Sequence, residues 1–229
     1  MKSRLLLTLV CTLLMGCLAW SCSNNAKRIK NVEIVQKTAP KPTPKPTTEQ
    51  SGPHCRLLIQ PYGNFSQAKA QEVSTQLVAA LNKHMSGLAV TEVKLLPNKP
   101  LTTALMNDGK TRYRARKILD QQQGLVKQPG DVIIGLTNKD ISTTLHGHDD
   151  FGILGLSYMN KSNSIISTFR VKDKSQFWKV VLHEFGHGFL GLPHCPNNDR
   201  SCFMVDANGK PNLPPERHFC DSCSKHIPK

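Results

Sequence analysis

The sequence predicts a mixed α/β (α+β) domain in which a twisted sheet is backed by helices and a small cysteine-rich segment ends the chain. Two observations carry this prediction. Between residues 56 and 137, short apolar runs alternate with segments of helical period, an order typical of a sheet covered by helices. Beyond residue 175, an amphipathic helical segment is followed by four cysteines.

Each element is predicted from its own residues. Residues 56–61 and 131–137 are apolar enough to be buried strands, and residues 88–96 alternate well enough to be another. Residues 67–85 carry apolar side chains at steps of four, which predicts a helix, and residues 111–123 predict a second helix. The resulting order is strand, helix, strand, helix, strand.

Two further apolar segments, residues 152–158 and 163–169, are separated by polar residues 160–162. We expect them to pair as strands across a turn. Before them stands a cluster of polar side chains that we expect to be a loop, with a metal or substrate site as the alternative. Its members are His146, His148, Asp149 and Asp150.

The most informative helix is expected to begin near Ser175, which is a suitable N-cap. Phe177, Val181 and Phe185 follow at steps of four, so we expect them to form a buried stripe that fixes the helix in the core. Gly191 tolerates the left-handed conformation that ends helices, so the helix is expected to stop there.

Three histidines and a glutamate in this region suggest a metal site. His183 and His187 are one helical turn apart and can present two imidazoles to one ion. Beyond the helix end the chain can fold back and bring His194 as the third ligand that a catalytic zinc usually takes. Glu184 is placed to accept a proton from metal-bound water. Two alternatives stay open: an ordinary helix face, or a Glu184 that merely orients a histidine.

This pattern resembles a known group of enzymes. His-Glu-x-x-His, a glycine turn, a third histidine and a later methionine resemble the metzincin zinc peptidases. The cysteine directly after the third histidine, the Cys-Phe-Met of residues 202–204 and the Cys-x-x-Cys of residues 220–223 are similar to the archaemetzincin family. The resemblance extends over residues 54–229.

Two spacings depart from the family pattern. Three residues, rather than two, separate His187 from Gly191, so His194 comes one residue late. Six residues, rather than four, lie between Cys195 and Cys202. We expect the extra residue at the helix end to be absorbed by a bulge or a tighter last turn.

The resemblance implies a catalytic zinc held by His183, His187 and His194, with Met204 in a turn beneath the histidines. It also implies that residues 152–158 form an edge strand that receives the substrate backbone, because an open edge offers N–H and C=O groups to a peptide. An ordinary interior strand is the alternative. The implied substrate is a peptide or protein.

Four C-terminal cysteines are enough for a closed, tetrahedral zinc site without catalytic water. They are Cys195, Cys202, Cys220 and Cys223. The family pattern and the position of Cys195 beside His194 favour this second, structural zinc. Disulfides are the alternative, because an exported protein meets an oxidising compartment. Cys55 has no assigned partner.

Residues 1–22 predict a signal peptide of the bacterial lipoprotein type. A basic start precedes an apolar run too short to span a membrane, and either Cys17 or Cys22 could become the lipidated first residue. A simple signal peptide or an uncleaved anchor is the alternative. Residues 23–53 are rich in Pro, Thr and Lys and predict an extended tether. We therefore expect an exported lipoprotein, anchored to the membrane, with residues 54–229 as its catalytic domain.

The net charge of +14 comes from basic residues scattered along the chain. No nucleic-acid motif accompanies them, so we expect no nucleic-acid partner and interpret the charge as a solvated surface that favours anionic lipid or acidic substrates. The prediction is a monomeric zinc metallopeptidase. The alternative is a non-catalytic, zinc-binding exported lipoprotein, which the extra residue before Gly191 favours.

Overall fold

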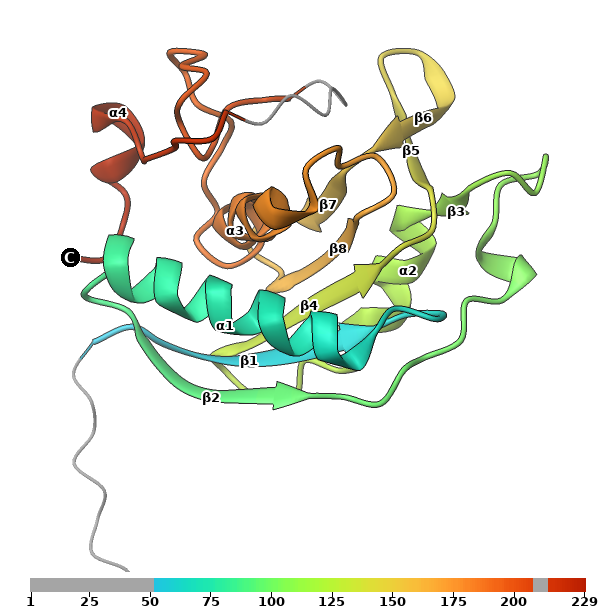
Figure 1. Ribbon diagram of the computed structural model, residues 1–229, viewed down its shortest axis with the longest axis horizontal. Coiled ribbons are helices and arrows are strands. Elements are labelled where there is room, and N and C mark those ends of the chain that lie inside the picture. The colour runs from blue at the N-terminus through green and yellow to red at the C-terminus, as the bar shows by residue number, and fades with distance from the viewer. Residues whose placement is uncertain (1–51, 208–213) are drawn as a thin grey trace, which may run out of the picture. The chain divides into compact units, whose positions relative to one another are not determined.

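The computed structural model describes residues 52–207 and 214–229. The expected signal peptide and nearly all of the expected tether lie outside the described residues. The domain is built on a five-stranded mixed sheet in the order β2-β1-β4-β8-β7 (Figure 1). Its four parallel strands are β1 (His54–Pro61), β2 (Ala89–Leu95), β4 (Asp131–Thr137) and β8 (Asn163–Ser167). The edge strand β7 (Gly155–Tyr158) runs antiparallel to β8.

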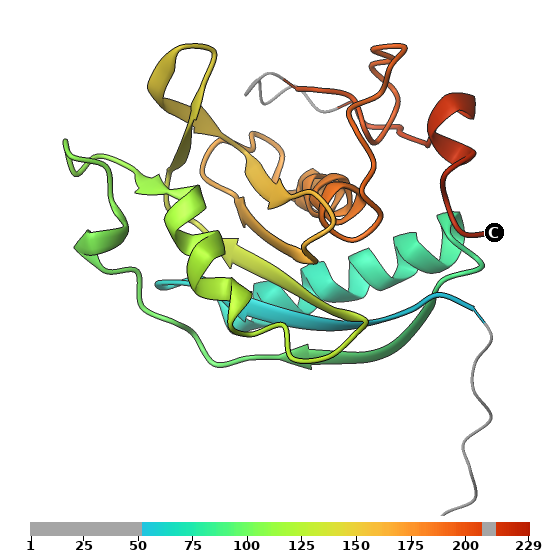
Figure 2. The ribbon, with the colours of Figure 1, turned by 180° about the vertical axis from the view of Figure 1, so that it is seen from behind.

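Helices cover both faces of this sheet. The helices α1 (Gln67–His84) and α3 (Phe177–Gly188) lie on one face, and α2 (Ala115–Gln123) lies on the other (Figures 1 and 2). The helix α1 begins where the Ser66 side chain accepts a hydrogen bond from the Lys69 N–H, and it buries one apolar stripe against the sheet. The predicted fold class is confirmed, because a mixed sheet backed by helices is what the structure contains.

A small second sheet, β3-β5-β6, departs from the prediction. The expected helix at residues 111–123 starts only at Ala115, because β3 (Tyr113–Arg114) pairs with β5 (Ile141–Leu145). Of the expected loop, only His146 lies in the turn between β5 and β6, where Gly147 has φ 75°. The other three members, His148, Asp149 and Asp150, belong to the strand β6 (His148–Ile153). The segment 152–158 is therefore not one strand, since Leu154 separates β6 from β7.

Ion pairs hold the β5–β6 hairpin to the rest of the domain. Arg112 contacts Asp140 at 2.9 Å and Asp150 at 2.8 Å, and Arg170 reaches Asp140 at 2.7 Å. The Arg170 guanidinium also lies directly over Gly152, where a Cβ atom would collide with it. The hairpin is thus fixed at one end, while its turn projects from the domain (Figure 1).

The C-terminal segment shares the main core. Cys195, Cys202, Phe203 and Met204 are buried in the same apolar cluster as the inner faces of α1 and α3. The short helix α4 (Asp221–Ser224) lies near the end of α1, where the Gly87 N–H donates to the Pro228 carbonyl at 3.4 Å. The described residues also contain two 3-10 turns, η1 (Thr103–Leu105) and η2 (Lys174–Gln176). Among the described residues, no helix combines the length and apolar character needed to cross a bilayer.

Candidate active site

The helix α3 carries the candidate metal ligands and is fixed by its opposite face. Phe177, Val181 and Phe185 are at most 1% exposed and pack into the core as the sequence predicts. The start of the helix differs from the prediction. Asp173, rather than Ser175, supplies the cap, because its carboxylate accepts the Ser175 N–H at 2.9 Å and begins the η2 turn that leads into α3.

Three imidazoles converge beside α3. Ring nitrogens of His183, His187 and His194 all lie within 4.8 Å of one another. The Nε2 atoms of His183 and His187 are 3.0 Å apart, close to the separation of about 3.3 Å that two ligands of a tetrahedral zinc have. The structure thus brings together the three histidines that the sequence proposed, including the late His194.

Backbone carbonyls set the tautomers of the first two histidines. The Nδ1 of His183 donates to the Phe203 carbonyl at 2.7 Å, and the Nδ1 of His187 donates to the Leu192 carbonyl at 2.5 Å. Burial lowers the pKa of His183 well below its usual value and that of His187 to about 4, so both rings are neutral near pH 7. Two Nε2 lone pairs then face each other, and a cation between them relieves their repulsion. The donor set therefore fits zinc.

A wide turn after α3 accommodates the extra residue. The Leu192 N–H donates to the Gly186 carbonyl at 2.9 Å, a closure one residue wider than the usual glycine-ended helix terminus. Gly191 has φ 65° and lies directly against the Asn160 side chain, so a Cβ atom has no room there. Of the two expected ways to absorb the extra residue, the structure therefore has the wider, bulged closure rather than the tighter turn, and His194 still returns to the other two histidines.

Glu184 is held by the edge strand β7. Its carboxylate accepts a hydrogen bond from the Ser157 hydroxyl at 2.7 Å, and the residue is 5% exposed. Burial raises the pKa of Glu184 to about 7, although the Ser157 hydrogen bond acts in the opposite direction. A Cβ atom on Gly155 would lie 2.7 Å from the Glu184 Oε1. The carboxylate thus occupies space that only glycine leaves free.

A methionine lies beneath the helix, as the family pattern implies. Met204 is fully buried, and a Cβ atom on Gly186 would lie 2.6 Å from its sulfur. The Met204 carbonyl accepts the Cys195 N–H at 2.7 Å. Met204 therefore links the histidine cluster to the cysteine cluster by packing and by one backbone hydrogen bond.

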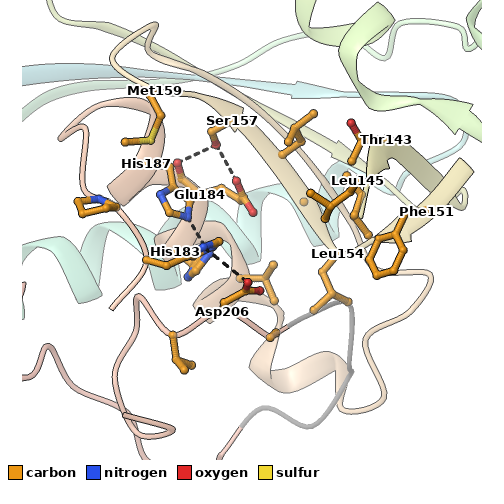
Figure 3. Close-up of a pocket in the computed structure, with 18 of the residues that line it drawn as sticks. Thr143, Leu145, Phe151, Leu154, Ser157, Met159, His183, Glu184, His187 and Asp206 are labelled. Carbon is orange, nitrogen blue, oxygen red and sulfur yellow. Dashed lines mark hydrogen bonds and ion pairs between the residues drawn. The ribbon is translucent and has the colours of Figure 1, made fainter. Parts of the chain in front are cut away.

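The cavity beside these residues has a volume of about 410 Å³ and two unlike sides (Figure 3). One side presents His183, Glu184 and Asp206, and the other presents apolar side chains that include Leu145 and Phe151 of the β5–β6 hairpin. The strand β7 lines the cavity between them. Within the described part of the chain β7 pairs only with β8, so it is an edge strand, as expected.

The four C-terminal cysteines also converge. Their sulfur atoms all lie within 4.8 Å of one another, and Cys195 and Cys220 are 3.5 Å apart. A disulfide requires about 2.05 Å, whereas two thiolates on a tetrahedral zinc are about 3.8 Å apart. All four residues are buried free thiols. Cys55 is buried apart from them on β1, and burial raises the pKa of its thiol to about 11.

The histidine and aspartate cluster of the β5–β6 hairpin does not form a third group. In residues 52–207 and 214–229, only the three histidines and the four cysteines gather at metal-ligand spacing. Asp150 is engaged by Arg112 and by the Asn107 amide, each at 2.8 Å, while the ring of His148 stacks on Phe151. These residues fix the hairpin.

Sequence reasoning missed three site residues. Gly155 and Ser157 alternate along β7 and face Glu184, a placement that the strand period could have indicated once the edge strand was paired with the helix. Asp206 lies 3.7 Å from His194 Nδ1 and follows the predicted Met204 by two residues. No sequence signal distinguished it from a surface carboxylate.

An edge strand beside a helix with His-Glu-x-x-His, a third histidine after a glycine turn and a methionine beneath define a zinc metallopeptidase of the metzincin type. No protein-family model matches the sequence. An archaemetzincin from Haloquadratum walsbyi is 24% identical over 190 residues, which cover 73% of this chain and 96% of the relative. An archaemetzincin from Nanoarchaeum equitans is 30% identical over 130 residues, which cover 54% of this chain and 67% of the relative.

The fold comparison agrees. The crystal structure of an archaemetzincin from Archaeoglobus fulgidus, complexed with malonate, matches 75% of this chain and 99% of its own with a TM-score of 0.56 and 25% identity. The chain belongs to the archaemetzincin family. The resemblance inferred from residues 183–223 is thereby confirmed.

Proposed function

We propose that this chain is an exported, lipid-anchored peptidase in which Glu184 is the general base and His183, His187 and His194 hold the catalytic zinc. The observation that carries the proposal is the buried Glu184 carboxylate, fixed by Ser157 beside three converging imidazoles. Zinc, when bound, supplies Lewis-acid chemistry by lowering the pKa of a water and polarising a carbonyl.

The roles of the protein's own residues follow from their positions. Glu184 takes the proton of the attacking water and returns it to the leaving amine. Ser157 holds one carboxylate oxygen and leaves the other for this transfer. The open edge of β7 offers backbone groups to an extended peptide along the cavity, which presents the scissile bond to the histidine side. The substrate is accordingly a peptide or protein.

The test compares wild type, Glu184→Gln and the matched control Glu72→Gln, an exposed position on α1. We expect all three to bind equal zinc and to unfold alike. Cleavage of a broad peptide library should fall by about 10²- to 10⁴-fold in Glu184→Gln alone, the usual contribution of a general base. Zinc binding without cleavage by wild type would instead support the non-catalytic binding protein.

We further propose two zinc ions per chain, the second held by Cys195, Cys202, Cys220 and Cys223. Their buried, converging sulfurs support this count. Metal analysis and thiol titration of the purified, unreduced protein test it together. We expect two zincs and thiols that become reactive only after metal removal. One zinc with no titratable thiol among these four would establish disulfides.

The anchoring proposal is supported by the apolar leader and by its two small-residue–cysteine junctions. Expression of wild type, Cys17→Ala and Cys22→Ala in a bacterium, followed by fractionation and mass spectrometry of the N-terminal peptide, identifies the lipidated residue. We expect one of the two variants to lose both the acyl chains and the membrane fraction. Recovery of all three in the cytoplasm would contradict export.

A further inference from the structure

A second cavity, of about 740 Å³, lies between α1, the start of α3 and the C-terminal segment. Five basic side chains line it: Lys83, His84, Lys179, Arg217 and His218. Among the described residues that line the cavity, Glu216 is the only acid. The two lysines and the arginine concentrate positive charge around a concave surface, and such a surface attracts anions.

Two of these cations are largely withdrawn from water. Lys179 is 4% exposed, and its ammonium donates to the carbonyls of Pro214 and Pro215. Arg217 donates through Nη2 to the carbonyls of Cys202 at 2.6 Å and Phe203 at 3.1 Å, while its buried Nε has no acceptor. In the described part of the chain neither side chain forms an ion pair.

Holding two such charges together is unfavourable without an anion. Burial and the nearby Arg217 charge together lower the pKa of Lys179. An ammonium and a guanidinium that are drawn out of water beside each other carry both a desolvation cost and a mutual repulsion. Backbone carbonyls compensate part of this, and an oxyanion in the cavity would compensate the rest.

The cavity also has an aromatic floor. The Lys179 ammonium lies 5.4 Å from the Trp178 ring and the Arg217 guanidinium 5.7 Å from the Phe203 ring. The two rings are 6.0 Å apart, and Ala79 and Ala80 of α1 line the wall beside them. A ligand that satisfies this surface carries an apolar or aromatic portion as well as charge.

Arg217 connects this cavity with the metal cavity, because it lines both. The Phe203 carbonyl accepts hydrogen bonds from Arg217 Nη2 and from His183 Nδ1. An occupant of the second cavity therefore contacts a side chain that shares its acceptor with a candidate zinc ligand.

We propose that the second cavity binds a small phosphate monoester with an aromatic or apolar portion, its phosphate held by Lys179 and Arg217 with Lys83 at the mouth. A phosphate monoester matches the site because its oxygens accept several charge-assisted hydrogen bonds and its charge near −2 balances two cations. Trp178 supports the apolar portion.

Isothermal titration of the zinc-loaded full chain with phenyl phosphate and with inorganic phosphate tests the proposal. We expect one phenyl phosphate per chain, bound more tightly than inorganic phosphate. Lys179→Met and Lys83→Gln should each weaken binding about tenfold, the effect of losing one charge-assisted hydrogen bond. Lys94→Gln, an equal charge change at an exposed position on β2, should leave the affinity within about twofold.

Lys83→Gln keeps the test decisive if the buried Lys179 variant does not fold, because Lys83 lines the cavity and is exposed to solvent. The proposal would be overturned if phenyl phosphate bound equally well to wild type, Lys83→Gln and Lys179→Met. Such a result would place the phosphate at the zinc or at random on the surface. So would inorganic phosphate binding as tightly as phenyl phosphate. Binding to phosphatidylglycerol vesicles without binding of either soluble phosphate would assign these cations to a membrane surface and likewise reject the site.

Discussion

The histidine cluster and the cysteine cluster begin at neighbouring residues, His194 and Cys195, yet their surroundings are opposite. The four cysteines are at most 8% exposed, whereas the His194 side chain is 49% exposed and borders the cavity beside α3. A closed thiolate set leaves no place for water, and an open imidazole set beside a carboxylate leaves one. The difference teaches that neighbouring residues can belong to two kinds of cluster, one closed within the core and one open to a cavity.

The largest expected effect comes from opening the closed cluster. Cys220→Ser combined with Cys223→Ser removes half of its ligands, and we expect the free energy of unfolding to fall by more than about 4 kcal/mol, since structural zinc binding is coupled to folding. Urea unfolding and zinc analysis measure both losses. Cys55→Ser is the matched control, because Cys55 is buried apart from the cluster and should keep both zincs. A double variant that retains full stability would refute the structural role.

Chelation should separate the two clusters by kinetics. A chelator such as dipicolinate should first remove the ion from the accessible histidines and abolish cleavage, while circular dichroism stays unchanged. Release from the buried cysteines should require a thiol-reactive mercurial, and helix content and the unfolding midpoint should fall with it. Simultaneous release of both ions with loss of structure would show that the clusters form one cooperative unit, and would contradict the prediction that they lose metal independently.

A smaller effect, confined to the open site, is expected from Gly155→Ala. The new Cβ would lie 2.7 Å from the Glu184 carboxylate and 2.7 Å from its Cγ, so the side chain must move away from its position beside the histidines. We expect peptide cleavage to fall about 10²-fold because misplacing a catalytic group by about 1 Å has such an effect. Zinc content should stay at the wild-type value. Gly109→Ala, which meets no atom within 4 Å, is the matched control.

The members of both clusters could be predicted from the sequence because they lie within short segments of recognisable pattern. His183 and His187 are related by the helical period alone. Phe177, Val181 and Phe185 form the buried stripe of the same helix, which indicated that the two histidines lie on its other face. The main strands and helices were predicted for the same reason. Each is a run of apolar residues with one period that the core enforces.

The features that were missed depend on partners distant in the chain. The strand β3 forms only because Tyr113 pairs with Ile141, and the hairpin turn places His146 at φ 52°, a conformation that histidine alone does not suggest. The wide turn after α3 depends on Asn160 packing against Gly191. Arg217 had no local signal at all, since its importance lies in which two cavities it borders.

The smallest expected effect is the effect of acid on stability through Asp131, a residue that belongs to neither cluster. Burial would raise the pKa of Asp131, but the Lys127 N–H at 2.9 Å and the Arg56 guanidinium at 2.6 Å hold it below its usual value. A lowered folded-state pKa stabilises the fold fully above the unfolded value, about 3.9, and this contribution is lost as pH falls through the folded value.

Asp131→Asn should therefore lower the free energy of unfolding at pH 7 and flatten its decline below about pH 4. Urea unfolding of wild type, Asp131→Asn and the exposed control Asp108→Asn across this range measures the effect. Any zinc lost in acid is lost from all three proteins, so the difference between them isolates the Arg56–Asp131 pair at the β1–β4 junction. If the free energy of unfolding of Asp131→Asn fell with pH as steeply as that of wild type, the Arg56–Asp131 pair would not cause the loss of stability. The loss would then be assigned to the metal clusters.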